Sequence, residues 1–497
     1  MGTLNFTKKS ISTKAYSFDD VLLKPAHSCV LPKEALISTS IGQYSFAIPV
    51  ISAAMDTVTD SRMAIAMALN GGLGVVHKNF SITDQVYHVK KVKSHQYAKI
   101  PDPETVSPDL SVKQLKQKII STSITGFPVI NAQGVLVGMC TQRDIRFCND
   151  DIKLVKDIMS KSVVSLKNEI SMEQARDFFS NYKFEKLPLV DEKNKLVALI
   201  TSKDLLNSTN YPHASKDSQG RLLCAAAVGV GDVDGFTRAE ELIQVGLDIL
   251  VIDSAHGHSQ QVLDTVTKVK NKYPEIFIMA GNVATAEGAK DLVAAGASAI
   301  KVGIGPGSIC TTRIVTGVGC PQLSAILEVS NCIKEKYPNI ALIADGGIRY
   351  SGDLVKAIAA GADMVMLGSL LAGTEQSPGD VVLHNGRSFK SYRGMGSVQA
   401  MKSSFNNRYN QASIANSKKL VPEGVEARVP YRGKVEDVIF QLIGGLKSGM
   451  GYLGCKNLKQ LYQKSEFVEI SPGGLNESHV HDVVISSHAP NYYGKKL

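Results

Sequence analysis

The stretch Ala294-Ala295-Gly296-Ala297-Ser298-Ala299-Ile300-Lys301-Val302-Gly303 decides the fold, because its pattern returns as AAGADMVMLG at 359–368. In both copies a run of small residues contains a glycine, which is the usual C-cap of a helix, and a short loop leads onward. An apolar run without polar alternation then follows and ends in another glycine. Such a run predicts a strand that is buried on both faces, as in a parallel sheet.

Eight apolar runs of this kind occur along the chain, each ending in small or polar residues. They lie at 48–52, 72–76, 222–226, 249–253, 276–280, 299–303, 341–345 and 364–368. Eight alternating strand–helix units predict an α/β protein with a (β/α)8 (TIM) barrel. The alternative is a doubly wound open sheet. It needs fewer strands and usually a G-x-G-x-x-G turn, which does not follow the first strand.

An internal repeat separates the second strand–helix unit from the third. The strings FPVI at 127–130 and TQRDI at 141–145 return 60 residues later as LPLV and TSKDL. One constant offset indicates a duplicated module inserted into a barrel loop. We therefore expect a first barrel part at 1–94, an inserted pair at 95–210 with halves at 95–150 and 151–210, and a second barrel part at 211–497.

The composition excludes several classes of protein. The 497 residues are 44% apolar and 20% charged, which is ordinary globular usage and argues against disorder. The net charge of +9 comes from scattered lysines, so it favours anionic small molecules at least as well as nucleic acid. None of the eight cysteines forms a C-x-x-C pair, and no signal or membrane-spanning run is present. We therefore expect a cytoplasmic protein without membrane contact.

The regular alternation ends after the eighth strand. Asn385-Gly386 between two extended segments predicts a two-residue hairpin turn. The stretch 393–435 that follows has little periodicity and is rich in glycine, serine, asparagine and charge. A long loop at the catalytic face of a barrel favours a mobile flap.

Catalytic chemistry in a barrel resides at the carboxyl ends of the strands. Glycine-rich turns there, at Gly347 and Gly368, would expose N–H groups to a phosphate, with Ser308 as a hydroxyl donor. Asp345 suits a sugar diol, so the pattern indicates a phosphorylated ribose. The alternative is that these glycines only permit tight turns.

The loop at 303–312 contains the candidate nucleophile. Its three alternating glycines (303, 305 and 307) allow carbonyl groups to face inward and to replace part of the hydration shell of a monovalent cation. Cys310 lies at the end of this loop, where backbone dipoles favour the thiolate. A small buried hydrophobe is the better interpretation for the other seven cysteines.

The end of the fourth strand offers Asp253 and Ser254 to a hydroxyl-rich second ligand. His256 and His258 follow closely, but no Asp, Glu or Cys lies at ligand spacing, so the sequence does not favour a metal there.

Together these residues resemble the inosine-5′-monophosphate (IMP) dehydrogenase family over essentially the whole chain, in the style of its bacterial members. The resemblance rests on YSFDDVLL at 16–23, SAAMDTV at 52–58, HKN at 77–79, GIGPGSICTT at 303–312, ADGGI at 344–348, YRGMGS at 392–397 and ESHVHDV at 477–483. The inserted repeat is similar to a tandem CBS (Bateman) pair.

The resemblance implies an NAD-dependent oxidation of IMP, the committed step of guanine nucleotide synthesis. Cys310 would attack C2 of the purine and hydride would pass to NAD. Water would then hydrolyse the thioimidate to xanthosine monophosphate (XMP). Arg408 and Tyr409 match the family's water-activating pair. Arginine is a poor base because its pKa exceeds about 12, so this role needs a depressed pKa or a water already polarised by Thr312.

The resemblance also implies the binding residues. Those for the substrate are Met55, Ser308, Asp345, Gly347, Gly368, Ser369, Tyr392, Met395, Gly396 and Glu423. Those for NAD are Asp253, Ser254, Asn282 and Gly303. Those for a potassium ion are the carbonyls of Gly305, Gly307 and Cys310 with Glu477, Ser478 and His479 of a neighbouring subunit. A shared ion site implies a homotetramer or an octamer.

The inserted pair implies a regulatory adenine or guanine nucleotide. Thr141 and Thr201 would meet its phosphates, and Asp144 and Asp204 its ribose. The alternative is a structural duplication whose sites are empty.

Three other functions remain open from the sequence. The nearest is GMP reductase, an NADPH-dependent relative; Arg408-Tyr409 argues against it, and the insertion also leans towards the dehydrogenase. A flavin-dependent barrel oxidase has no task for Cys310. A nucleotide-sensing or nucleic-acid-binding protein with a decayed barrel would not need to retain Cys310 and Asp345.

Overall fold

The structure is a computed structural model whose residues fall into two compact units. It describes residues 14–95, 100–202, 210–402 and 420–492, except positions 102, 123, 147, 149, 168, 169, 171, 183 and 488. One unit contains the described residues of 1–94, 213–217 and 222–497, and the other contains those of 95–212 and 218–221. Each unit has its own hydrophobic core.

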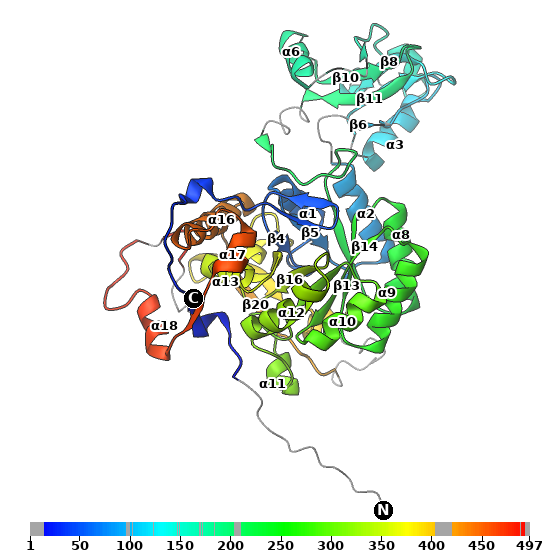
Figure 1. Cartoon of the computed structure of the whole chain (residues 1–497). Coiled ribbons are helices and arrows are strands. Elements are labelled where there is room, and N and C mark those ends of the chain that lie inside the picture. Colours follow the sequence, from blue (N-terminus) through cyan, green and yellow to red (C-terminus); the bar gives the residue numbers. More distant parts are fainter. Residues whose placement is uncertain are drawn as a thin grey trace, which may run out of the picture. The chain divides into compact units, whose positions relative to one another are not determined.

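The first unit is built around a closed barrel of eight parallel strands (Figure 1). In spatial order these are β4 (Val50–Ser52), β5 (Leu73–Val76), β12 (Ala225–Val228), β13 (Ile249–Asp253), β14 (Phe277–Val283), β15 (Ala299–Val302), β16 (Ala341–Asp345) and β17 (Met364–Leu367). The ring closes where Val365 of β17 pairs with Val50 of β4. Every residue of β13 is buried, which explains the unbroken apolar runs of the sequence.

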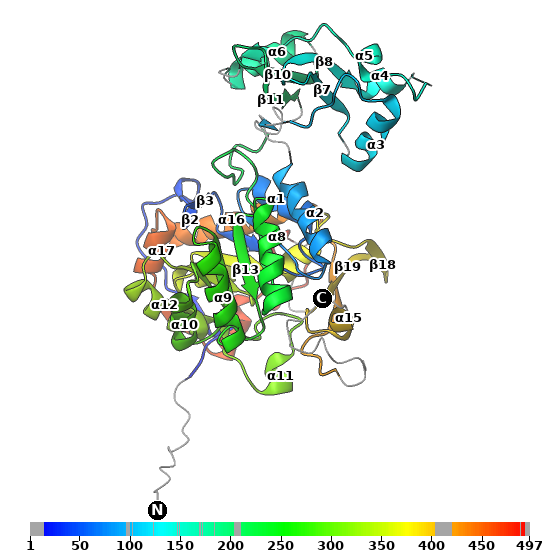
Figure 2. The same cartoon turned by 90° about the vertical axis from the view of Figure 1, so that its right-hand side faces the viewer.

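Helices follow the strands and cover the outside of the barrel (Figures 1 and 2). They are α1 (Ser61–Leu69), α2 (Ile82–Lys93), α8 (Arg238–Gln244), α9 (Gln260–Lys272), α10 (Ala286–Ala295), α12 (Gln322–Lys336), α13 (Ser351–Ala359) and α16 (Val435–Tyr452). Polar caps start several of them. Asp60, for example, accepts hydrogen bonds from the amides of Arg62 (2.8 Å) and Met63 (3.2 Å) at the start of α1. None of the helices described is both long and apolar enough to cross a membrane.

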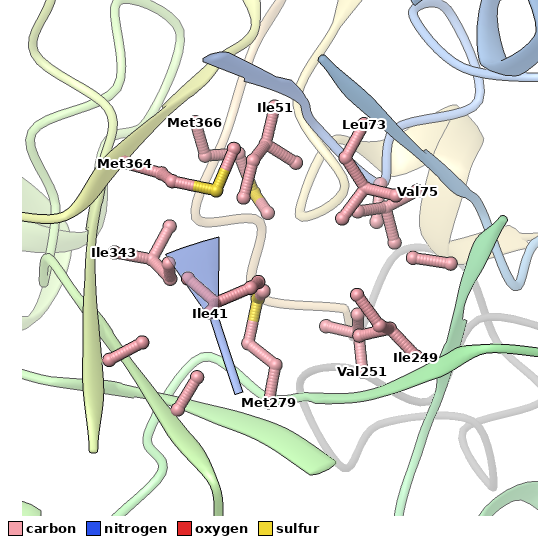
Figure 3. Close-up of a cluster of buried hydrophobic side chains, with 14 of the residues drawn as sticks. Ile41, Ile51, Leu73, Val75, Ile249, Val251, Met279, Ile343, Met364 and Met366 are labelled. Carbon is pink, nitrogen blue, oxygen red and sulfur yellow. The ribbon is translucent and has the colours of Figure 1, made fainter. Parts of the chain in front are cut away.

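The interior of the barrel is filled by side chains from the strands and from one hairpin. Figure 3 shows side chains such as Ile51, Leu73 and Met279 pointing inward from around the ring. Ile41 comes from the hairpin of β2 (Thr39–Ile41) and β3 (Tyr44–Phe46), and it packs in the same cluster. The barrel is therefore solid, and ligands can be held only at its ends.

Shorter elements complete the first unit. Near the N-terminus lie η1 (Phe18–Asp20), β1 (Val21–Leu23) and η2 (Pro32–Glu34), and β1 pairs with β21 (Phe467–Glu469). The others are η3 (Asp232–Thr237), α11 (Thr312–Thr316), α14 (Ser369–Ala372), β18 (Val381–His384), β19 (Arg387–Arg393), α15 (Val398–Lys402), β20 (Glu426–Pro430), α17 (Leu458–Lys464) and α18 (Pro472–Ser478).

The second unit shows the 60-residue repeat directly in its elements. Its first half has α3 (Val112–Thr122), β7 (Gly126–Ile130) and β8 (Leu136–Thr141), and its second half has α6 (Met172–Tyr182), β10 (Lys186–Val190) and β11 (Leu196–Thr201). Each element of the second half begins 60 residues after its counterpart. The remaining elements are β6 (Ile100–Pro101), α4 (Gln142–Arg146), α5 (Val155–Ile158) and β9 (Leu166–Lys167).

The predicted (β/α)8 fold is confirmed, with two local differences. The third strand is Ala225–Val228 rather than 222–226, because residues 222–224 lead into the strand as a buried extended segment. The stretch 393–435 was expected to lack regular structure, but β20 pairs antiparallel with β19 and α15 is helical. The hairpin at Asn385-Gly386 is present, and both residues have positive φ angles of 49° and 74°.

Candidate active site

A buried lysine joins three polar residues at the carboxyl ends of neighbouring barrel strands. Lys301 of β15 is 1% exposed. Its Nζ donates to Asp253 Oδ1 (2.8 Å), Asn282 Oδ1 (2.5 Å) and Asp345 Oδ2 (2.8 Å). Asn282 Nδ2 in turn donates to Asp345 Oδ2 (3.0 Å) and to the Gly303 carbonyl (2.8 Å). The lysine therefore balances two carboxylates where the barrel opens to ligands.

The sequence analysis did not single out Lys301 for a role. The signal was present, since a lysine inside an apolar run that is buried on both faces must find a buried partner. Because the run fitted a barrel strand, its one charged residue was passed over.

Cys310 lies half-buried at the end of the loop that follows β15. Its thiol donates a hydrogen bond of 3.1 Å to Thr312 Oγ1, and its amide donates to the Gly307 carbonyl at 3.1 Å. Gly303 and Gly305 have φ angles of 148° and 76°, conformations that L side chains rarely adopt. Gly303 and Gly305 therefore allow a loop conformation that other residues would adopt only under strain.

Two segments that are distant in the sequence pack against this cysteine loop. Cys310 forms a β-bridge with Gly424, and the Thr311 amide donates to the Glu423 carbonyl at 3.0 Å. The Glu423 amide donates to the Gly396 carbonyl at 3.0 Å. A Cβ atom on Gly424 would lie 3.4 Å from the carbonyl carbon of Gly396 and from the Ile309 carbonyl oxygen. Glu423, Gly396 and the neighbouring Met395 are therefore brought beside Cys310.

Tyr392 of β19 reaches the turns that were predicted to hold a phosphate. Its phenol is buried, and it points at Met55 Sδ at 3.8 Å. A hydrogen bond with the Ser308 side chain lowers its pKa, but the larger effect of burial raises the pKa above its ordinary value. A Cβ atom on Gly368 would lie 2.8 Å from the Tyr392 Oη. Met55, Ser308 and Gly368 thus converge on one hydroxyl group.

The turn after β16 carries two further glycines with positive φ angles. They are Gly346 at 89° and Gly347 at 79°, and both lie against Pro306 of the cysteine loop. This turn does not open a helix directly, because α13 starts only at Ser351. Ser369, by contrast, is the first residue of α14.

Arg313 bonds and packs against one side of the cysteine loop. Its Nε donates to the Ile304 carbonyl at 3.0 Å, and its guanidinium also bonds the Cys320 carbonyl. A Cβ atom on Gly305 would lie only 2.6 Å from Arg313 Cγ. The residues expected to complete an ion site lie elsewhere in the chain. Glu477 and Ser478 end helix α18, which packs on η1. His479 follows as the C-cap residue, and its Nδ1 lies 3.1 Å from the Tyr492 Oη.

The residues expected to contact NAD differ in exposure. Asp253 and Asn282 are 3% and 5% exposed and belong to the Lys301 network, whereas Ser254 is half-buried. His258 Nε2 lies 2.7 Å from Asp291 Oδ2. Within the described residues, no three His, Cys, Asp or Glu side chains gather as a metal site would require.

His77 lies next to this face, in the segment after β5. Its ring stacks on Phe80 with centroids 4.0 Å apart, and its Nδ1 accepts from the Asn79 amide at 3.1 Å. Burial lowers the pKa of His77 to about 4. Asn79 also donates to Asp56, which forms an ion pair of 2.6 Å with Arg393 at the base of the expected flap.

Three predicted residues lie outside the described part of the chain, namely Arg408, Tyr409 and Asp204. In the inserted unit Asp144 caps helix α4, because its Oδ2 accepts from the Thr141 amide (2.7 Å) and hydroxyl (2.8 Å). Thr201 ends β11 and is 6% exposed. The structural role of Asp144 is therefore evident without a ligand.

Fold and site together define a (β/α)8 barrel protein with a thiol on a glycine loop beside polar residues at the barrel mouth. Residues 15–481 match the family model described as the IMP dehydrogenase / GMP reductase domain. The chain therefore belongs to the IMP dehydrogenase / GMP reductase family.

Curated relatives align over almost their full length. Proteins named inosine-5′-monophosphate dehydrogenase from Aquifex aeolicus and Methanocaldococcus jannaschii are both 50% identical, covering 96% and 98% of this chain and 97% and 99% of their own. The protein of that name from Helicobacter pylori is 52% identical, covering 97% of this chain and 100% of its own.

A solved structure of a GMP reductase is also similar. This cysteine-to-alanine variant from Trypanosoma brucei, in complex with guanosine 5′-monophosphate, is 37% identical. The match has a TM-score of 0.84 and covers 96% of this chain and 99% of that chain. Because it spans nearly the whole chain, the inserted unit does not separate reductase from dehydrogenase, contrary to the leaning stated from the sequence.

Proposed function

We propose that this protein is an IMP dehydrogenase, an NAD-dependent oxidoreductase that converts IMP to XMP. The observation that carries the proposal is the position of Cys310, whose loop is hydrogen-bonded to the segment of Glu423 and Gly424. Relatives named for this activity share about half of the sequence over its full length. The GMP reductase of the similar solved structure is 37% identical.

Substrate binding is assigned to the groups around Tyr392. Ser308, Gly347, Gly368, Ser369 and Tyr392 would hold the phosphate, and Asp345 would accept from the ribose hydroxyls. Lys301 fixes the orientation of Asp345, because its Nζ donates to Asp345 Oδ2 at 2.8 Å. The backbone of Met395 and Gly396, with Glu423, would bond the edge of the purine beside Cys310.

The first chemical step forms a bond between Cys310 Sγ and C2 of the purine. The hydride on C2 leaves to the nicotinamide of NAD, and the thiol proton leaves through Thr312 or solvent. Ser254 and Asn282 would contact NAD, together with Asp253 and Gly303. In the second step a water oxygen bonds to C2, the C2–S bond breaks, and XMP departs. Arg408 and Tyr409 would take the proton from this water, which Thr312 would help to polarise.

A potassium ion would suit the cysteine loop. The Gly307 carbonyl accepts one hydrogen bond from the Cys310 amide, which leaves a second lone pair for a cation. The carbonyls of Gly305 and Cys310 would complete one side of the site. Glu477, Ser478 and His479 of a neighbouring subunit would complete the other, which makes the protein a homotetramer or an octamer.

We place the protein in the cytoplasm.

The inserted unit, residues 95–210, is proposed to be a tandem CBS pair that senses an adenine or guanine nucleotide. The two helix–strand–strand halves, offset by 60 residues, support this assignment. Thr141, Asp144, Thr201 and Asp204 would line the sites. Asp144 would then have to exchange its capping bonds to Thr141 for bonds to the ligand.

Two parallel assays test the proposed reaction. One contains the purified protein with potassium, IMP and NAD, and the other contains it with guanosine monophosphate and NADPH. We expect reduced nicotinamide to accumulate in the first and to stay constant in the second. Consumption of NADPH in the second assay alone would identify a reductase and remove the role given to Arg408 and Tyr409.

A further inference from the structure

Lys390 is a buried cation that none of the steps above uses. It lies on β19 and is 2% exposed. Its ammonium donates to two backbone carbonyls, those of Thr374 (3.1 Å) and Ser377 (2.6 Å). Burying an ammonium is costly unless a compensating interaction exists, and neutral carbonyls compensate only in part. The cost of burying this ammonium therefore indicates that its charge has a function.

The two carbonyls belong to the turn that ends helix α14. Thr374 Oγ1 donates to the Leu371 carbonyl at 2.7 Å, and Ser377 Oγ donates to the Ala372 carbonyl at 2.6 Å. Both hydroxyl residues are fully buried. The Lys390 ammonium therefore bonds the turn after α14, and the hydroxyl groups of that turn bond the last carbonyls of the helix.

The other end of α14 is held by the same strand. Tyr392 is two residues along β19 from Lys390, so the two side chains share one face of the strand. Gly368 precedes α14, and a Cβ atom there would lie 2.8 Å from the Tyr392 Oη. One strand therefore fixes both ends of the short helix that begins with Ser369.

The charge of Lys390 has no counterpart among the proposed phosphate contacts. Those contacts are all uncharged, namely Ser308, Gly347, Gly368, Ser369 and Tyr392. A phosphate monoester carries about −1.5 to −2 charges at neutral pH. The helix of four residues, about 6 Å long, and the turn to Thr374 separate the ammonium from the start of α14, and a charge acts more strongly across such a buried, low-dielectric interior than through water.

Four charged side chains, one basic and three acidic, act on Lys390 from its surroundings. Burial is the main cause that lowers its pKa, and Arg62 adds to this effect. Asp380, Asp60 and Glu375 act in the opposite direction, but none of them bonds the ammonium.

We propose that Lys390 is the positioning residue of the phosphate site: it fixes α14 against Tyr392 and supplies the positive charge behind otherwise neutral phosphate contacts. The inference rests on the proposed function, because the phosphate is that of the purine nucleotide. It assigns a specific electrostatic task to a residue that touches no substrate.

Binding of IMP, measured by titration calorimetry at pH 5.5 and 7.5, tests this proposal without requiring turnover. The second pKa of a phosphate monoester is about 6, so the wild-type protein should bind more tightly at the higher pH. Lys390→Met should weaken binding at pH 7.5 by roughly 10-fold and flatten this pH dependence. Lys390→Gln keeps an N–H donor without the charge and should behave alike. If Lys390→Met does not fold, the measurement is made on Lys390→Gln alone.

Lys356→Met provides the matched control, because Lys356 also donates to a backbone carbonyl, that of Phe18 at 2.8 Å, but lies on α13. It should keep the affinity and pH dependence of the wild type. Wild-type pH dependence in both Lys390 variants would overturn the proposal, even if they were less stable. If the protein binds IMP tightly but does not reduce NAD, the proposed reaction is contradicted. The role of Lys390 is still decided by comparing IMP binding in the Lys390 and Lys356 variants.

Discussion

At the scale of single residues, the surroundings of Cys310 differ from those of the buried cysteines. The prediction that the other seven cysteines are all buried is wrong, because Cys29 is exposed and Cys148, Cys320 and Cys332 are half-buried. Cys140 and Cys224 are fully buried, and burial raises the pKa of Cys140 to about 12 and that of Cys224 further. Those thiols stay protonated and serve as small apolar side chains. Cys310 is half-buried, hydrogen-bonded to Thr312, and placed where three loop segments meet.

Replacing this thiol should stop the reaction without removing the substrate site. We expect Cys310→Ala to lower kcat by at least about 10³-fold, because the covalent step is lost. IMP binding measured by calorimetry should stay within about threefold, since the proposed binding groups are other residues. Cys320→Ala, a partly buried neighbour in the chain, is the control. Normal turnover by Cys310→Ala would exclude the covalent mechanism.

Site residues could be predicted from the sequence where they lie at the end of a strand or in the turn after it. Asp345 and Gly368 end apolar runs, and Cys310 lies in the glycine loop after the run at 299–303, so their places at the strand ends could be inferred from the sequence. The apolar run around Lys301 signalled that this lysine needs a buried partner. Neither that partner nor the burial of Lys390 could be predicted, because the partners of both lysines come from distant segments. Only tertiary packing determines whether a lysine in a strand faces solvent or a buried acceptor.

His77 makes stability depend on pH. Its folded pKa of about 4 lies below the value of about 6.5 in an unfolded chain. Between these values the unfolded state binds the extra proton, so the contribution is complete above about pH 6.5 and is lost towards pH 4. The loss should be on the order of 3 kcal/mol. Urea unfolding at pH 6.5 and 4.5 should show that the free energy of unfolding falls less between these pH values in His77→Phe than in the wild type. The exposed control His384→Phe should show the same fall as the wild type.

At the scale of elements, helix–strand alternation made the barrel predictable. Apolar runs marked all eight strands, and only β12 was displaced, because the segment before it is equally apolar and buried. β20 was missed because its sequence, Glu426–Pro430, is polar and exposed, and it is ordered by pairing with β19. Pairing partners that lie far along the chain leave no local signal.

The role proposed for the flap, in hydrolysis, can be separated from hydride transfer by kinetic measurements. Arg408→Ala should slow hydrolysis of the thioimidate by roughly 100-fold or more while leaving hydride transfer nearly unchanged, because only the second step uses water. Rapid-mixing measurements should then show a burst of NADH followed by slow turnover. Lys402→Ala, in α15 of the same segment, should behave as the wild type. A variant at Arg408 without a burst would contradict the assigned role.

At the scale of the whole molecule, the barrel retains both connections to the inserted unit. Lys93, at the end of α2, bonds Asp217 Oδ2 (2.9 Å) and Asp248 Oδ2 (2.7 Å). All three side chains are at least nine-tenths buried. The two chain segments that lead to and from the insertion are therefore anchored to each other within the barrel unit.

Removal of the insertion should leave a working barrel. When residues 95–212 are replaced by a short Gly/Ser linker, kcat should stay within about threefold, because the site and its anchoring ion pairs are retained. Adenine and guanine nucleotides should then no longer alter the rate. A persistent nucleotide effect would place the regulatory site in the barrel, and loss of all activity in a folded protein would show that the insertion completes the active site.

The most direct test of the account is the covalent intermediate on Cys310. The protein is mixed with IMP and NAD, quenched in acid within one turnover, digested, and analysed by peptide mass spectrometry. We predict that the peptide containing Cys310 gains the mass of the nucleotide less two hydrogens, one lost from C2 as hydride and one from the thiol as a proton, and that this requires NAD. An adduct on another cysteine, or none at Cys310 while XMP forms, would contradict the mechanism.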